Sequence, residues 1–279
     1  LNAAGRLDSA MLSYDLLTAT IAGTASRLAH QLGSLNRERQ KLTAEAVAQA
    51  EYRLPGERLC DELVFIADRG WKPGIVGLVA SRLAEEFYRP AVVVELGEEF
   101  SRGSARSIPE FHITQALDAC HGQGLLVRHG GHAAAAGFTV RTERLPDLAT
   151  ALAGIATGLL AGQDLCPSLQ IDAMVDLQSL DWATYHLMAG LEPFGYGNPE
   201  PLLASMGVEV VSARAVGSDS KHLKLRLSDS RRQWDAIAFG WGWMIEDMPA
   251  SIDIAYSLQP NEWNGRVNLE LLVRDIRPA

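Results

Sequence analysis

An alternation of strands and helices begins with the run Glu62-Leu63-Val64-Phe65-Ile66-Ala67, which predicts a buried strand. Pro73-Gly74 then predicts the start of a helix that continues through Tyr88, because proline is favoured in a first helical turn. Ala91-Val92-Val93-Val94-Glu95-Leu96 predicts a second strand. Strands that alternate with helices are typical of an α/β layer architecture, so residues 62–96 predict an α/β domain.

The α/β pattern extends to residue 160. Residues 101–107 predict a polar strand or loop, 113–120 a helix, 138–140 a short strand and 143–160 an Ala/Leu helix. The best candidate for a linker is Ala161-Gly162-Gln163-Asp164-Leu165-Cys166-Pro167-Ser168, after which the composition changes.

Five β-rich runs follow the candidate linker, at 202–211, 222–227, 235–239, 252–258 and 267–273. Turn residues separate them at fairly regular spacing, which predicts a small barrel or sandwich. One helix is predicted in this half, at 180–191.

A long helical pattern precedes the α/β domain. Leu28, Leu32, Leu35, Leu42 and Ala46 recur at spacings that place them on one helical stripe. A helix from about Ala22 to Arg53, stopped by Pro55-Gly56, would be about 48 Å long and could join two domains. Two ordinary helices broken near Gly33 are an equally open alternative.

Composition limits the class of protein. The chain has 279 residues, of which 47% are hydrophobic and 21% charged, and this excludes a disordered or fibrous chain and suggests two domains. No apolar run is long enough to span a membrane. The three cysteines lie far apart, which fits a reducing, cytoplasmic location. A first residue that is not Met, in Leu1-Asn2-Ala3-Ala4-Gly5-Arg6-Leu7, suggests a fragment of a longer protein.

The densest chemical signal is His129-Gly130-Gly131-His132-Ala133-Ala134-Ala135-Ala136-Gly137. Its glycines let the backbone approach a ligand closely, and the alanine run predicts a helix whose N-terminus would favour a phosphate beside His132. A plain glycine turn is the structural alternative. A metal pair of His129 and His132 is weakly supported, because no further ligand lies nearby in the sequence.

A second signal is Arg102-Gly103-Ser104-Ala105-Arg106-Ser107. In an extended segment, Ser104 and Arg106 share a face, and a hydroxyl beside a guanidinium suits a terminal phosphate. A solvated polar strand would have the same pattern. Arg6, which follows Gly5, is a third candidate, and the alternative is a surface arginine paired with Asp8.

The third signal is the alternation in Lys221-His222-Leu223-Lys224-Leu225-Arg226-Leu227, which places the leucines on one face and His222, Lys224 and Arg226 on the other. This basic stripe predicts either a groove for single-stranded nucleic acid or a solvated face. Five of the six tryptophans lie in the same half, and each is expected to be a core or interface residue: Trp182, Trp234, Trp241, Trp243 and Trp263. The net charge of −9, most of it in residues 151–279, argues against wholesale coating of a polyanion.

The sequence has no Asp/His cluster at metal-binding spacing, no P-loop, no G-x-S-x-G and no dinucleotide fingerprint. Phosphate-binding groups without a metal centre indicate half of an active site.

Several blocks together resemble the RecJ single-strand-specific DNA exonucleases of the DHH phosphoesterase superfamily. They are Leu1 to Asp8, Gly74-Ile75-Val76-Gly77-Leu78-Val79-Ala80-Ser81-Arg82, Gly103-Ser104-Ala105-Arg106-Ser107-Ile108, Gly130-Gly131-His132-Ala133-Ala134-Ala135-Ala136-Gly137, Glu192-Pro193-Phe194-Gly195-Tyr196-Gly197-Asn198-Pro199-Glu200-Pro201 and Lys221-His222-Leu223-Lys224-Leu225. They occur in the family's order and span nearly the whole chain. The G-G-H block is shared across the superfamily, whereas G-S-A-R-S and P-F-G-x-G-N-P-E-P are specific to RecJ.

The resemblance implies four segments. Residues 1–20 would end a DHH-side module, 21–54 would form a connecting helix, 55–162 an α/β DHHA1 domain and 168–279 an all-β OB-fold domain. The DHH domain, with its Asp/His metal ligands, is absent from this sequence.

The resemblance also implies a function, the 5′→3′ degradation of single-stranded DNA in repair and recombination. In the intact enzyme two divalent ions, Mn²⁺ or Mg²⁺, would activate water through the DHH domain, and no metal is expected in this chain. Ser104 and Arg106 would hold the 5′-phosphate, and His132 would act at the scissile phosphate. Strand contacts are assigned to six residues: Arg6, Gly130, Gly131, His222, Lys224 and Arg226. The chain alone is expected to be inactive.

Two other functions stay open. The chain could be a non-catalytic module whose OB domain binds single strands or a protein such as a single-strand-binding protein. It could instead belong to a DHH/DHHA1 phosphodiesterase for short RNA or cyclic dinucleotides. Those enzymes generally lack an OB domain, so the second alternative depends on residues 168–279 not forming a barrel.

Overall fold

The computed structural model describes residues 1–57, 59–195, 197–229, 231–263 and 265–279, so Tyr196 of the P-F-G-x-G-N-P-E-P block lies outside the described residues. The chain divides into two compact units, Leu1–Pro167 and Ser168–Ala279. Each unit has its own hydrophobic core.

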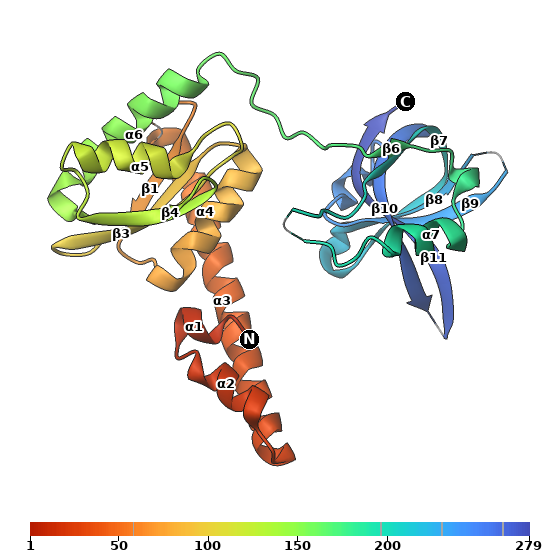
Figure 1. Ribbon diagram of the computed structural model, residues 1–279, viewed down its shortest axis with the longest axis horizontal. Helices are drawn as coiled ribbons and strands as arrows, with labels where there is room; N and C mark the ends of the chain where they lie inside the picture. The colour runs from red at the N-terminus through yellow and green to blue at the C-terminus, as the bar shows by residue number, and fades with distance from the viewer. Residues whose placement is uncertain (58, 196, 230, 264) are drawn as a thin grey trace. The chain divides into compact units, whose positions relative to one another are not determined.

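The first unit contains a five-stranded sheet with the order β1-β2-β3-β5-β4. Figure 1 labels three of its strands, β1, β3 and β4. The strands are β1 (Val64–Asp68), β2 (Ala91–Glu95), β3 (Phe100–Arg106), β4 (Arg128–His132) and β5 (Ala135–Arg141). β1 and β2 are parallel and are connected through α4 (Pro73–Phe87), whereas the other neighbours are antiparallel. The α/β expectation for this region is confirmed.

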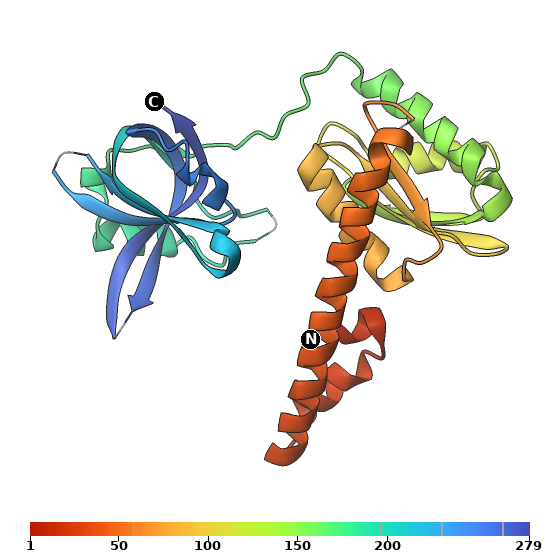
Figure 2. The same cartoon turned by 180° about the vertical axis from the view of Figure 1, so that it is seen from behind.

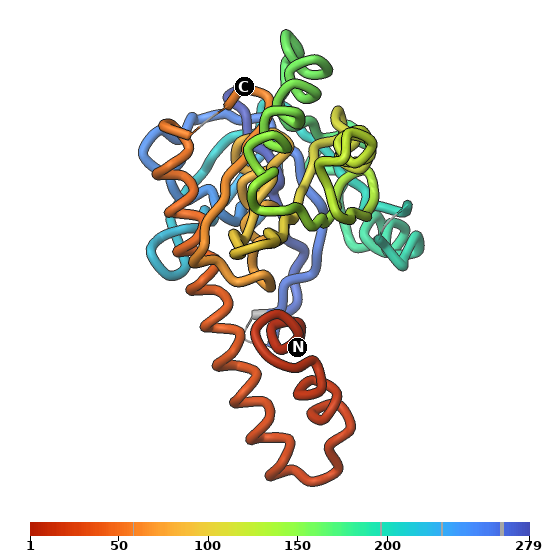
Figure 3. Tube along the Cα trace, turned by 90° about the vertical axis from the view of Figure 1, so that its left-hand side faces the viewer, coloured from red at the N-terminus to blue at the C-terminus, as the bar shows by residue number. Residues whose placement is uncertain are grey.

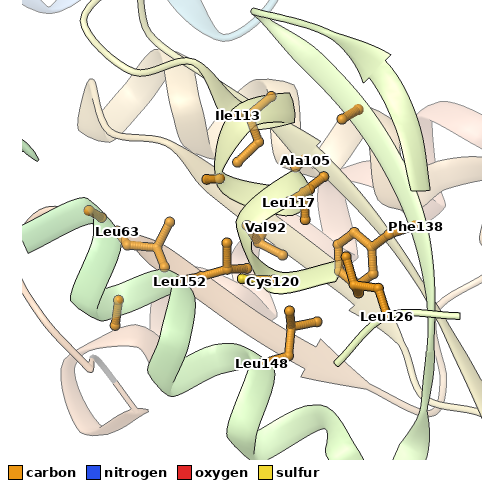
Figure 4. Packing of buried hydrophobic residues seen from close by; sticks show 14 of the residues in the cluster. Leu63, Val92, Ala105, Ile113, Leu117, Cys120, Leu126, Phe138, Leu148 and Leu152 are labelled. Atoms are coloured by element: carbon orange, nitrogen blue, oxygen red, sulfur yellow. The ribbon is translucent and has the colours of Figure 1, made fainter. Parts of the chain in front are cut away.

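Helices cover both faces of the sheet. On one face, α5 (Ile113–Gly122) and α6 (Leu145–Leu160) enclose a core that includes Val92 and Val94 (Figure 4). On the other face, α3 (Ala22–Glu57) and α4 pack over Ala91 and Val93. β2 is therefore buried on both sides, which explains its continuous apolar sequence.

The N-terminal helical pattern forms one helix. α3 runs without a break from Ala22 to Glu57, past Gly33, so the alternative of two helices is wrong (Figure 2). Pro55 does not stop it at once, although a proline beyond the first turn cannot donate the hydrogen bond to the carbonyl four residues earlier; α3 ends two residues later, at Glu57. α1 (Ala4–Leu7) and α2 (Met11–Thr18) lie beside its N-terminal half (Figure 3).

The second unit is a closed barrel. Its strands are β6 (Ala173–Met174), β7 (Leu203–Val216), β8 (His222–Ser228), β9 (Gln233–Ala238), β10 (Ser251–Trp263) and β11 (Arg266–Pro278), with α7 (Trp182–Ala189) before β7. The order β7-β8-β9-β11-β10 closes through pairing of β10 with β7, and β9 and β11 are parallel. This five-stranded closed topology is that of an OB fold, which the resemblance implied; the β-rich runs alone had left a barrel or a sandwich open.

The prediction of a helix after His132 is wrong. Ala135 and Ala136 belong to β5, where they pair with Arg106 and Ala105 of β3. The helix propensity of an alanine run is a weak preference, and tertiary pairing overrides it here. His132 therefore ends the strand β4, which the sequence did not predict.

Gly103 is expected to contribute to the stability of the first unit. A Cβ atom there would lie 2.0 Å from Cζ of the buried Phe138. Gly103→Ala should therefore lower the free energy of unfolding of the first unit by about 1–3 kcal/mol through overpacking. Thermal unfolding followed by circular dichroism checks this. Gly137→Ala is the matched control, because its Cβ would make only an ordinary 3.7 Å contact; equal melting of the two variants would contradict the prediction.

Candidate functional site

The register of three strands builds one polar face on the sheet. Side chains directly opposite each other in paired strands point to the same face. Three such rows run across β3, β5 and β4: Arg102–Thr139–Arg128, Ser104–Gly137–Gly130 and Arg106–Ala135–His132. The intervening residues, such as Ala105, Ala136 and Phe138, belong to the core under α5 and α6. The rows therefore lie on the opposite side, the side of α4, and we call them the three-row face.

Ser104 and Arg106 meet beneath α4. The Arg106 Nη1 atom donates to Ser104 Oγ at 3.2 Å and to the main-chain oxygen of Ala105 at 2.8 Å. A Cβ at Gly77 of α4 would lie 3.1 Å from Ser104 Oγ, so glycine lets the helix pass over the pair without displacing the hydroxyl. No carboxylate among the described residues pairs with Arg106. A half-buried guanidinium in this state is ready to bind an anion.

Arg6 lies near this pair. It donates from Nη1 to the main-chain oxygen of Gly74, at the start of α4, rather than pairing with Asp8. Burial lowers the pKa of Arg106, and the positive charge of Arg6 lowers it further. The structure thus brings the two residues predicted for the 5′-phosphate, Ser104 and Arg106, close to Arg6, which was predicted as a strand contact. Two cations this close together favour a shared anion.

His132 occupies the same row as Arg106, with Ala135 between them. Its main-chain oxygen accepts a hydrogen bond from Thr114 Oγ1 at 2.7 Å, and the residue is exposed. Gly131 has φ +155°, and a Cβ there would lie 2.3 Å from the Ala135 oxygen, so the turn requires glycine. A Cβ at Gly130 would meet no atom within 4 Å, so this part of the face consists of accessible backbone.

The two histidines of the motif do not form a metal pair. His129 belongs to the opposite face of β4, where its Nε2 atom lies 2.6 Å from Asp118 Oδ1 of α5. Among the described residues, no three His, Cys, Asp or Glu side chains cluster so that they could hold a metal ion. The part of the chain that the structure describes therefore offers no ligand set for a divalent metal ion.

In the barrel, the predicted alternation of apolar and basic side chains is confirmed, but the basic side chains already have partners within the protein. Leu223, Leu225 and Leu227 are buried in the core. Lys224 forms an ion pair with the buried Glu270, and Arg226 lies 3.7 Å from Asp235. His222 Nδ1 accepts from the main-chain nitrogen of Gly240 at 3.1 Å. The stripe therefore attracts a phosphate backbone less than its sequence suggests.

Four residues that sequence reasoning did not select stand out in the structure. Arg102 and Arg128 belong to the three-row face, and only the register shows that they are neighbours. Phe239 and Trp243 are large aromatic side chains that are 61% and 70% exposed, unlike the buried Trp234. The available signal was the segment Phe239-Gly240-Trp241-Gly242-Trp243, in which two glycines alternate with aromatic residues and indicate a loop.

Comparison with known proteins identifies both units. The family model of the DHHA1 domain matches residues 61–157, and that of the RecJ OB domain matches residues 171–275. Within the described residues, no helix is long and apolar enough to cross a membrane.

Curated relatives and solved structures extend the match to the whole chain. The single-stranded-DNA-specific exonuclease RecJ of Bacillus subtilis is 34% identical over 99% of this chain and 35% of its own length. The corresponding Haemophilus influenzae protein is 29% identical over 100% of this chain and 50% of its own length. The crystal structure of RecJ in complex with Mn²⁺ from Thermus thermophilus matches with a TM-score of 0.79 and 30% identity, over 100% of this chain and 40% of that one. The chain spans half or less of the length of these relatives.

Proposed function

Because the chain belongs to the RecJ family, of whose C-terminal part it carries the DHHA1 and RecJ OB domains, we propose that it binds the 5′ end of single-stranded DNA for hydrolysis by the intact enzyme. The supporting observation is the juxtaposition of Ser104, Arg106 and Arg6 beneath α4, where no described carboxylate pairs with Arg106. A phosphate monoester carries more charge than a diester, so such a cluster favours a phosphorylated end.

We propose a separate role for each of these residues. Ser104 and Arg106 hold the terminal phosphate, and Arg6 contributes a second positive charge. His132, at the exposed end of the Arg106 row, contacts the scissile phosphate and stabilises charge that develops on it. Gly130 and Gly131 let the strand approach the backbone closely.

Hydrolysis itself requires groups that this chain does not contribute. We propose that the Mn²⁺ or Mg²⁺ of the intact enzyme is held by a DHH domain, and that this chain positions the DNA. The polarity of 5′→3′ degradation then follows from recognition of the 5′-phosphate. Repair and recombination, in the cytoplasm, are the processes we propose for the intact enzyme.

The assay that tests this proposal uses the chain by itself. Purified chain 1–279 should bind 5′-phosphorylated single strands more tightly than 5′-hydroxyl strands, and it should release no mononucleotides in the presence of Mn²⁺. Fluorescence anisotropy and denaturing gels measure the two properties. Mononucleotide release that EDTA abolishes, from a preparation free of contaminating nuclease, would contradict the proposed division of labour.

The barrel supports a second role, contact with a more distant part of the strand. Trp243 stacks on Trp241 with ring centroids 5.7 Å apart, and the neighbouring Phe239 lies edge-on to His222 at 5.0 Å. Exposed aromatic rings stack on bases without regard to sequence. His222, Lys224 and Arg226 would add phosphate contacts that their acidic neighbours weaken. Because most of the negative charge lies in residues 151–279, we retain a single-strand-binding protein as a second proposed partner of this unit.

The closed barrel disfavours the alternative of a phosphodiesterase for short RNA or cyclic dinucleotides. That alternative required residues 168–279 to form something other than a barrel.

A further inference from the structure

The row next to Ser104 contains two arginines to which the proposed function gives no role. Arg102 and Arg128 flank Thr139 in the three-row face, and both are exposed. Arg128 Nε donates to Thr139 Oγ1 at 3.2 Å, so this side chain already leans towards the middle strand. With Pro73 and Val76 of α4, the row borders a hollow of about 340 Å³ that Ser104 also lines.

Neither arginine has an acidic partner among the described residues. Glu95 lies opposite Arg102 in register on β2, but no ion pair joins them. Arg141, one row further along β5, does have such a partner, because its Nη1 atom lies 3.4 Å from Glu99 Oε1. On the three-row face, the described arginines without an acidic partner are thus Arg102, Arg106 and Arg128.

We propose that Arg102, Arg128 and Thr139 bind an internal phosphate of the same DNA strand whose 5′-phosphate lies at Ser104 and Arg106. This inference rests on the proposed function and adds a second phosphate subsite to it. Along β3, Arg102 lies two residues, about 7 Å, from Ser104 and four residues, about 13 Å, from Arg106, which is close to one or two phosphate spacings of an extended single strand. Across β5, the Cα atoms of Arg102 and Arg128 are about 10 Å apart, so two long side chains can converge on one phosphate above Thr139.

The surface between the two subsites suits a strand that lies flat. Gly137 and Gly130 form the intervening row with Ser104, and a Cβ at Gly130 would meet nothing within 4 Å. The sugar–phosphate backbone can therefore pass close to the sheet between the two phosphates.

The test removes one negative charge from the DNA at a time. A short 5′-phosphorylated oligothymidylate is prepared with a neutral methylphosphonate at each of the linkages nearest its 5′ end in turn. Affinity for the wild-type chain should fall several-fold at one of these linkages. The double variant Arg102→Gln/Arg128→Gln should bind the unmodified strand about tenfold more weakly than the wild type does. A neutral methylphosphonate at that linkage should not lower the affinity of this variant any further. Its affinity should also depend less steeply on salt concentration.

The control double variant is Arg82→Gln/Arg144→Gln, which removes the same charge from two exposed arginines with acidic partners. It should respond to the neutral linkage as the wild type does, and circular dichroism should show that both variants are folded. Equal sensitivity of the Arg102/Arg128 variant and the wild type to that linkage would overturn the inference. A wild-type chain that ignores the 5′-phosphate altogether would instead overturn the proposed function, so the two failures are distinguishable.

Discussion

Arg106→Gln should abolish the preference of this chain for 5′-phosphorylated over 5′-hydroxyl single strands. The half-buried guanidinium lies against Ser104 Oγ and close to the charge of Arg6, where no described carboxylate competes with a phosphate. A charge-assisted hydrogen-bonding contact of this kind contributes about 1.5–3 kcal/mol, so affinity for the phosphorylated strand should fall roughly ten- to a hundredfold. Affinity for the 5′-hydroxyl strand should be nearly unchanged. Anisotropy titrations with the two strands measure both values.

Two further variants make the result specific. Arg106→Lys keeps the charge but not the planar fork, so it should restore only part of the preference. Arg141→Gln removes a guanidinium from the same face of the sheet that is already paired with Glu99, so it should leave the preference unchanged. A loss of affinity for both strands to the same extent in Arg106→Gln would show that Arg106 supports the fold or general charge rather than the terminal phosphate.

Lys224→Met should destabilise the barrel strongly, although Lys224 was predicted as a DNA contact. Its partner Glu270 is only 5% exposed, and removal of the lysine leaves a buried carboxylate unpaired. Breaking such a pair costs about 3–5 kcal/mol, which corresponds to a decrease in Tm on the order of 10 °C. Tryptophan fluorescence is the suitable probe, because five of the six tryptophans lie in this unit.

Arg226→Met is the control that shows whether the loss of stability is specific to Lys224. Arg226 lies on the same strand and pairs with the exposed Asp235, and an exposed pair contributes less than about 1 kcal/mol. Lys224→Met/Glu270→Leu should recover most of the lost stability, since an apolar replacement of both partners removes the unpaired charge. Equal melting of Lys224→Met and Arg226→Met would contradict the structural role. A charge reversal at Lys224 is therefore a poor test of DNA binding.

The elements that the sequence predicts correctly are those whose residues carry their own signal. β2 is a run of β-branched residues buried on both faces, and α4 begins at a proline and presents one apolar stripe. The alternation of Leu223 with its basic neighbours correctly gives the inner face of β8. In each case the local pattern and the tertiary environment agree.

The misses concern features that exist only through pairing. His129-Gly130-Gly131-His132 has little intrinsic strand preference, and it is a strand because β5 supplies its hydrogen-bonding partner. Arg102 and Arg128 become neighbours through two antiparallel registers. Lys224 and Glu270 are 46 residues apart, so no local pattern could show that the lysine is already neutralised. The G-S-A-R-S motif was informative because its two functional side chains alternate within a single strand.

Closure of the barrel by β10 against β7 has a consequence for biosynthesis. The sheet of the first unit is complete once Arg141 has been made, whereas the barrel needs β11, which begins only at Arg266 and fits between β9 and β10. During translation, β7, β8 and β9 can therefore form only an open, aggregation-prone sheet until β11 has been synthesised. A stalled or prematurely terminated message would yield a protein with a finished phosphate-binding unit and an unfolded tail that proteases can remove.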